Sequence, residues 1–117
     1  MNPVIKVLQP SGILDSTKAS HFRQEISKLV EDKTDVVVID FKDVTFMDSS
    51  GLGALVLSRE IVLSAGAKLF LCAINEQIKM LFELTNVDRV FDIFPSREEL
   101  EEKIFNGSLQ LPSDGSN

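Results

Sequence analysis

Two adjacent serines, Ser49 and Ser50, are the residues of this chain best placed for a chemical modification. They lie between an apolar, β-branched segment and an apolar helical pattern, in the stretch Phe46-Met47-Asp48-Ser49-Ser50-Gly51-Leu52-Gly53-Ala54-Leu55. Ser49 or Ser50 is predicted to be the N-cap of the helix, beside backbone N–H groups that have no acceptor within the helix. These N–H groups and the positive end of the helix dipole favour a phosphate. We therefore predict that one of the two serines is a phosphorylation switch.

Two other functions of this stretch are weaker alternatives. An aspartyl phosphate at Asp48 or Asp40, as in a receiver-like domain, needs an acidic pair after the first strand and a lysine after a later one. Neither stands at a convincing place. A small serine hydrolase needs a base, and the only histidine, His21, falls among solvent-facing positions of a predicted helix. The serines also lack the glycine two positions earlier that a nucleophile elbow requires.

Metal and nucleotide sites are not indicated. Asp40, Asp43 and Asp48 are close in sequence, and a hard cation prefers such oxygen ligands. However, Asp40 and Asp43 flank a predicted turn, where aspartate commonly bonds to nearby backbone. Gly51 and Gly53 lack the lysine and hydroxyl of a Walker loop. The sequence therefore predicts no catalytic residue, no metal and no cofactor.

The composition predicts one soluble domain. The 117 residues are 44% hydrophobic and 26% charged, which is enough for a single core. A net charge of −6 without a basic stripe argues against a nucleic-acid partner. No apolar run approaches the roughly 20 residues that cross a bilayer, and the N-terminus lacks a signal-peptide core. Cys72 is the only cysteine and is interpreted as a core residue, so we expect a reducing, cytoplasmic location without membrane partners.

Predicted strands and helices alternate along the chain. Strands are expected at 4–8, continuing at 12–14 beyond the interruption at Pro10, and at 35–41, 68–74 and 90–94. Helices are expected to begin at Asp15, Ser16 or Thr17, at Ser49, at Asn75 and at Ser96, and the last should bury Leu100, Ile104 and Phe105. This alternation predicts an α/β domain over 1–107 with a mostly parallel sheet. Residues 108–117 are predicted to be a disordered tail.

Apolar side chains around the serines indicate a docking surface. Met47 and Leu52, with the two glycines, are expected to surround the hydroxyl at an exposed corner. A phosphoryl group there adds about −1.5 to −2 charges without melting the helix. It would disrupt a partner interface by its bulk, desolvation cost and charge.

These residues resemble the STAS domain of bacterial anti-sigma factor antagonists. The resemblance is carried by 46–53, with the string DSSGLG, and by Gly12-Ile13-Leu14-Asp15, and it extends from Val4 to about Phe105. It implies a small mixed, mostly parallel sheet with about four helices packed mainly on one face. It also implies a non-enzymatic protein whose Ser49 is phosphorylated by an anti-sigma serine kinase. The unphosphorylated form would bind that kinase and free the sigma factor, and a PP2C-type phosphatase would restore it.

The resemblance also implies which residues face the partner. These are Asp15, Met47, Asp48, Ser50, Gly51, Leu52 and Gly53. Family members often carry an extra N-terminal edge strand, and too few residues precede Val4 to form it in full. An open edge permits self-association, so a monomer or weak homodimer is expected.

Overall fold

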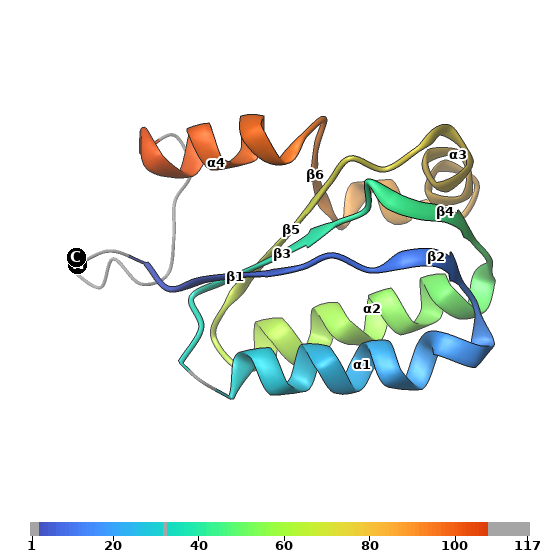
Figure 1. Ribbon diagram of the computed structural model, residues 1–117, viewed down its shortest axis with the longest axis horizontal. Coiled ribbons are helices and arrows are strands. Elements are labelled where there is room, and N and C mark those ends of the chain that lie inside the picture. The colour runs from blue at the N-terminus through green and yellow to red at the C-terminus, as the bar shows by residue number, and fades with distance from the viewer. Residues whose placement is uncertain (1–2, 32, 108–117) are drawn as a thin grey trace.

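The computed structural model describes residues 3–31 and 33–107, and the predicted tail over 108–117 lies outside these residues. Figure 1 shows the elements in chain order. They are β1 (Ile5–Leu8), β2 (Ser11–Leu14), α1 (Ser16–Val30), β3 (Val36–Asp40), β4 (Asp43–Met47), α2 (Ser49–Ser64), β5 (Lys68–Cys72), α3 (Glu76–Leu84), a 3₁₀ turn (Val87–Arg89), β6 (Asp92–Phe94) and α4 (Arg97–Phe105). None of the described helices is long and apolar enough to cross a membrane.

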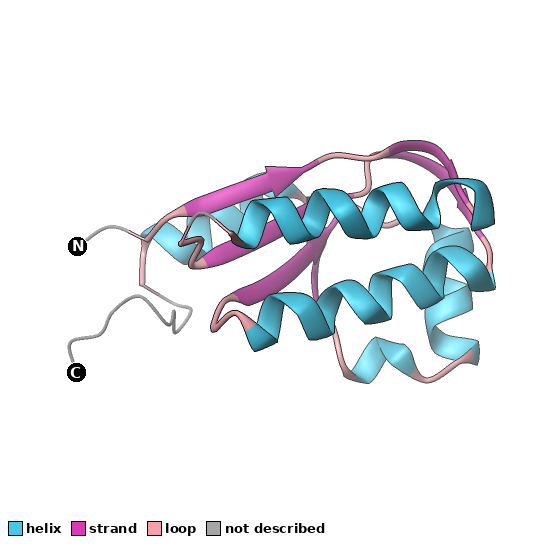
Figure 2. Ribbon diagram, turned by 90° about the horizontal axis from the view of Figure 1, so that it is seen from below, coloured by secondary structure: helices cyan, strands magenta, loops and turns pink. Residues whose placement is uncertain are grey.

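A four-stranded parallel sheet forms the centre of the molecule. Its strand order is β1-β3-β5-β6, and all three pairings are parallel. All five residues of β3 are buried, because helices cover both faces of the sheet. Helices α1 and α2 lie side by side on one face, whereas α4 lies on the other (Figures 1 and 2). The predicted α/β fold, a mostly parallel sheet with about four helices mainly on one face, is confirmed, and all the strand pairings among the described residues are parallel.

The core is divided by the sheet into two unequal parts. The larger part lies under α1 and α2 and includes Phe22, Ile26 and Leu55. The smaller part lies under α4, which buries Leu100 and Ile104. The expectation that Phe105 also points inward is wrong, since its side chain is 74% exposed. A helix turns about 100° per residue, and α4 ends at Phe105, so this residue lies off the face that Ile104 buries.

A second, two-stranded parallel sheet of β2 and β4 leads into the first turns of both long helices. Pro10 separates β1 from β2, as expected, because proline has no N–H for the strand ladder. β4 is a strand that the sequence pattern does not indicate. Its pairing skips Thr45, and Thr45 and Phe46 are both exposed, which breaks the two-residue alternation.

Candidate functional site

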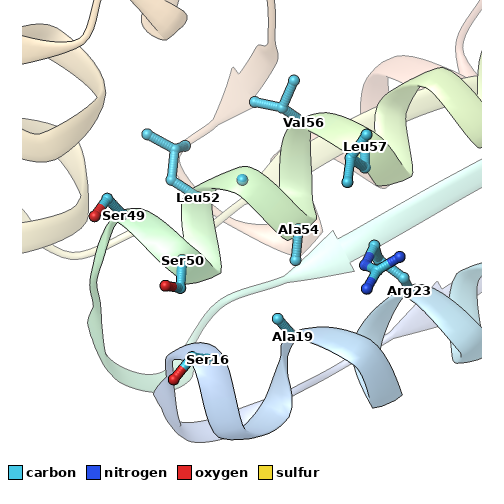
Figure 3. A pocket seen from close by; sticks show the side chains of 10 residues that line it. Ser16, Ala19, Arg23, Ser49, Ser50, Leu52, Ala54, Val56 and Leu57 are labelled. Carbon is cyan, nitrogen blue, oxygen red and sulfur yellow. The ribbon is translucent and has the colours of Figure 1, made fainter.

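Ser49 is the first residue of α2, and its side chain is exposed (Figure 3). The N-cap is Asp48, whose Oδ1 accepts a hydrogen bond from the N–H of Gly51 at 3.0 Å. The prediction that Ser49 or Ser50 caps the helix is therefore wrong. Aspartate caps as well as serine, and its negative charge also favours the helix N-terminus. Within the described residues neither serine hydroxyl has a hydrogen-bond partner. Both serines are exposed, so another protein can reach their hydroxyls.

The first turn of α2 is pressed against the end of β2. The N–H of Asp48 donates to the carbonyl oxygen of Leu14 at 3.3 Å. A Cβ on Gly51 would lie 2.9 Å from the carbonyl carbon of Leu14 and closer still to its oxygen. A Cβ on Gly53 would meet no described atom within 4 Å outside its chain neighbours and the backbone of its own helix. Gly51 is thus required by packing, whereas Gly53 is not.

The two apolar side chains expected around the hydroxyl are in the core. Met47 is fully buried and Leu52 is 6% exposed, so the prediction that they form an exposed apolar surface is wrong. Met47 faces inward and Phe46 faces outward, because adjacent residues of a strand point to opposite faces. Phe46 (44% exposed) pairs with Ile13 (47% exposed) on β2. Among the described residues, Phe46 is the exposed large apolar side chain nearest the serines in the sequence, and Ile13 is its partner on the neighbouring strand.

A groove between α1 and α2 begins at the serines (Figure 3). We call it the α1/α2 groove; its lining includes Ser16, Ala19, Arg23, Ser49, Ser50, Gly53, Ala54 and Leu57. In Figure 3 the hydroxyls of Ser16, Ser49 and Ser50 lie at one end and Arg23 lies farther along. The residues on the α1 side of this groove were not among the predicted site residues. The spacing of residues 16, 19 and 23 could have indicated them, because such positions share one helix face.

Asp15 is the N-cap of α1, as Asp48 is of α2, but it bonds to the residue two positions on instead of three. Its Oδ1 accepts hydrogen bonds from the hydroxyl and the N–H of Thr17, at 2.6 and 3.0 Å. The hydrogen bond from the Thr17 hydroxyl lowers the pKa of Asp15, so this carboxyl is ionised at neutral pH. The paired ends of β2 and β4 therefore bring Asp15 together with Asp48, Ser49, Ser50 and Gly53. The other three predicted partner-facing residues are buried: Met47, Gly51 and Leu52.

The residues that a hydrolase would need are not assembled. The side chain of His21 is 74% exposed, pairs with Glu25 at 3.5 Å and does not line the α1/α2 groove. Burial raises the pKa of the Cys72 thiol to about 12, so this residue is a neutral core group rather than a nucleophile.

The three aspartates considered as metal ligands or phosphate acceptors have separate structural partners. Asp40 is buried, accepts from the N–H of Lys42 at 3.0 Å and lies 3.8 Å from Arg97. Asp43 accepts from Gln9 at 2.7 Å. Asp48 is the α2 cap. Among the described residues no group of three carboxylate, histidine or cysteine side chains is placed to hold a metal ion.

Comparison with known proteins gives the family. Residues 1–100 match the model of the STAS domain. The chain is 32% identical over 88 residues to the anti-sigma-B factor antagonist of Bacillus subtilis, covering 75% of this chain and 80% of that protein. It is 22% identical over 91 residues to the anti-sigma F factor antagonist of Paenibacillus polymyxa, covering 77% and 78%.

Solved structures agree with this match. An anti-sigma factor antagonist from Mycobacterium paratuberculosis has a TM-score of 0.74 at 26% identity, covering 84% of this chain and 83% of that one. The unphosphorylated anti-sigma factor antagonist SpoIIAA has the same fold, with a TM-score of 0.64 at 20% identity and coverage of 86% and 88%. This chain has alternating strands and helices, and Ser49 and Ser50 are exposed at the start of α2, which we call the serine corner. It belongs to the STAS domain family, and the relatives named above are anti-sigma factor antagonists.

Proposed function

We propose that this protein is an anti-sigma factor antagonist that acts as a phosphoswitch and not as an enzyme. Its unphosphorylated form binds an anti-sigma serine kinase, and phosphorylation of Ser49 releases it. A PP2C-type phosphatase restores the binding form. The observation that carries the proposal is the exposed Ser49 hydroxyl, which takes no part in capping α2 or in the core.

The position of Ser49 suits a group that is modified reversibly. A phosphate on the first residue of a helix lies near backbone N–H groups without an intrahelical acceptor and near the positive end of the dipole. The helix therefore tolerates the phosphate. Because Asp48 caps the helix, neither adding nor removing the phosphate disturbs the cap.

The docking surface we propose is the corner formed by Asp15, Phe46, Ser50 and Gly53 together with the α1/α2 groove. The corner carries the ionised carboxylate of Asp15 before any modification. Phosphorylation adds about −1.5 to −2 charges to this place. A partner surface that fits the corner with its existing carboxylates then faces a larger negative charge. Like charges brought together in an interface weaken binding by several kcal/mol.

Phosphorylation of three proteins tests the proposed acceptor. The wild type, Ser49→Ala and Ser50→Ala are incubated with ATP and an extract of the host, and the site is mapped by mass spectrometry. We expect acid-stable phosphate on the wild type and on Ser50→Ala, and at least tenfold less on Ser49→Ala, because only the first hydroxyl is the acceptor. Acid-labile phosphate, or phosphate on Ser50 that persists in Ser49→Ala, contradicts the proposal.

A further inference from the structure

The strand that leads to Ser49 is held from the side by a glutamine of α3. β4 has one strand neighbour among the described residues, β2, and α3 lies beside its other edge (Figure 1). The N–H of Met47 donates to Oε1 of Gln77 at 2.9 Å, and Nε2 of Gln77 donates to the carbonyl oxygen of Met47 at 2.8 Å. One side-chain amide thus satisfies both backbone groups of a residue that lies two positions before Ser49.

A second amide from the start of α3 extends this contact along β4. Nδ2 of Asn75 lies 3.3 Å from the carbonyl oxygen of Val44 and 3.2 Å from that of Thr45. Oδ1 of Asn75 also caps α3 by accepting from the N–H of Ile78 at 2.9 Å. Buried backbone N–H and carbonyl groups need partners. Asn75 and Gln77 therefore supply, through side chains, what a neighbouring strand would supply through its backbone.

We propose that Gln77 is a positioning residue that sets the place of the Ser49 hydroxyl for phosphoryl transfer. This inference rests on the function proposed above. The two hydrogen bonds fix the position and the orientation of the Met47 backbone relative to α3. The side chain of Met47 is fully buried. On the opposite side the corner is fixed by the contact of Gly51 with Leu14. Ser49 is thus held between β2 and α3.

Loss of these bonds is expected to act on the reaction and only slightly on the fold. α3 remains attached without Gln77, because Asn75 still caps it and Ile78 and Phe82 are fully buried. The end of β4, however, loses its partner on one side. Transfer of a phosphoryl group requires the reacting atoms about 3–3.5 Å apart, and a displacement of about 1 Å can slow such a step roughly 100-fold.

Two substitutions of Gln77 and one control test the inference. Gln77→Ala removes both hydrogen bonds. Gln77→Glu keeps an acceptor for the Met47 N–H but sets a carboxylate against the Met47 carbonyl, so it should be no better than alanine. Gln24→Ala removes an exposed glutamine from α1 and serves as the matched control. Amide hydrogen exchange at Met47 is measured by NMR, and kcat and KM for phosphorylation at Ser49 are measured with ATP and the kinase purified from the host.

We expect both Gln77 variants to exchange the Met47 amide at least tenfold faster and to lower kcat about 10- to 100-fold, with KM changed less than threefold. Gln24→Ala should match the wild type in both measurements. If Met47 exchanges at the wild-type rate, or exchanges faster without a fall in kcat, the inference is overturned. If the wild type takes no phosphate at Ser49, the proposed function fails, and the exchange rates alone decide whether Gln77 holds β4.

Discussion

Gly51→Ala is expected to destabilise the fold by about 2–3 kcal/mol, as overpacking of a well-packed site does. The added Cβ would lie 2.9 Å from the carbonyl carbon of Leu14 and nearer to its oxygen. These are backbone atoms, so no side chain can turn aside to make room. Either α2 or β2 must move. A domain of this size should lose roughly 10 °C in melting temperature, measured by circular dichroism.

Gly53→Ala is the matched control, two residues along the same helix. Beyond its chain neighbours and the backbone of α2 itself, no described atom lies within 4 Å of a Cβ at this position, and alanine favours a helix over glycine. We therefore expect Gly53→Ala to stabilise the fold by about 0.5–1 kcal/mol. If Gly51→Ala is as stable as the wild type, or if both variants lose the same stability, the close approach of α2 to Leu14 is not what requires the glycine.

Ser49→Asp is expected to weaken binding of the anti-sigma kinase at least 100-fold while leaving the melting temperature within about 2 °C of the wild type. The new carboxylate joins those of Asp15 and Asp48 at the corner, and a desolvated like charge costs several kcal/mol in an interface. The fold is unaffected because a negative charge in the first turn of α2 suits the helix dipole. Ser49→Ala should bind as the wild type does and resist the kinase. Affinity is measured by calorimetry with the kinase purified from the host.

A control for added charge is available on α1. Gln24→Glu adds one negative charge at an exposed residue that does not line the α1/α2 groove. We expect its affinity to stay within threefold of the wild type, since exposed charges are largely screened by salt. Equal binding by Ser49→Asp and the wild type would show that charge at this position does not exclude the partner.

Much of the fold follows from local sequence signals. The run of β-branched residues at 36–39 predicts a strand buried on both faces, and Asp15, Asn75 and Ser96 are found as caps where helices were expected to begin. Gly66 ends α2 with a φ of +81°, the conformation that glycine adopts most easily. These features depend on a few neighbouring residues, so a single sequence contains them.

The details of the site depend on contacts between distant segments. Asp48 and the serines are all good caps, and only the hydrogen bond to Gly51 shows which of them caps α2. The burial of Met47 follows from β4, whose alternation is broken where it pairs with β2. Gln77 stands 30 residues from the backbone that it holds, and no local pattern marks it. The position of the two serines at the start of a helix was therefore predictable from the sequence. The contacts that hold them there, from Asp48 and Gln77, were not.

The most direct test compares the protein phosphorylated on Ser49 with the same sample after phosphatase treatment. Affinity for the kinase and the amide NMR spectrum are measured on both forms. We expect the phosphorylated form to bind at least 100-fold more weakly, with chemical-shift changes confined to the corner around residues 47–53 and the start of α1. Equal affinity of the two forms, or shift changes that spread through β3 and β5, would contradict a switch that alters docking while preserving the fold.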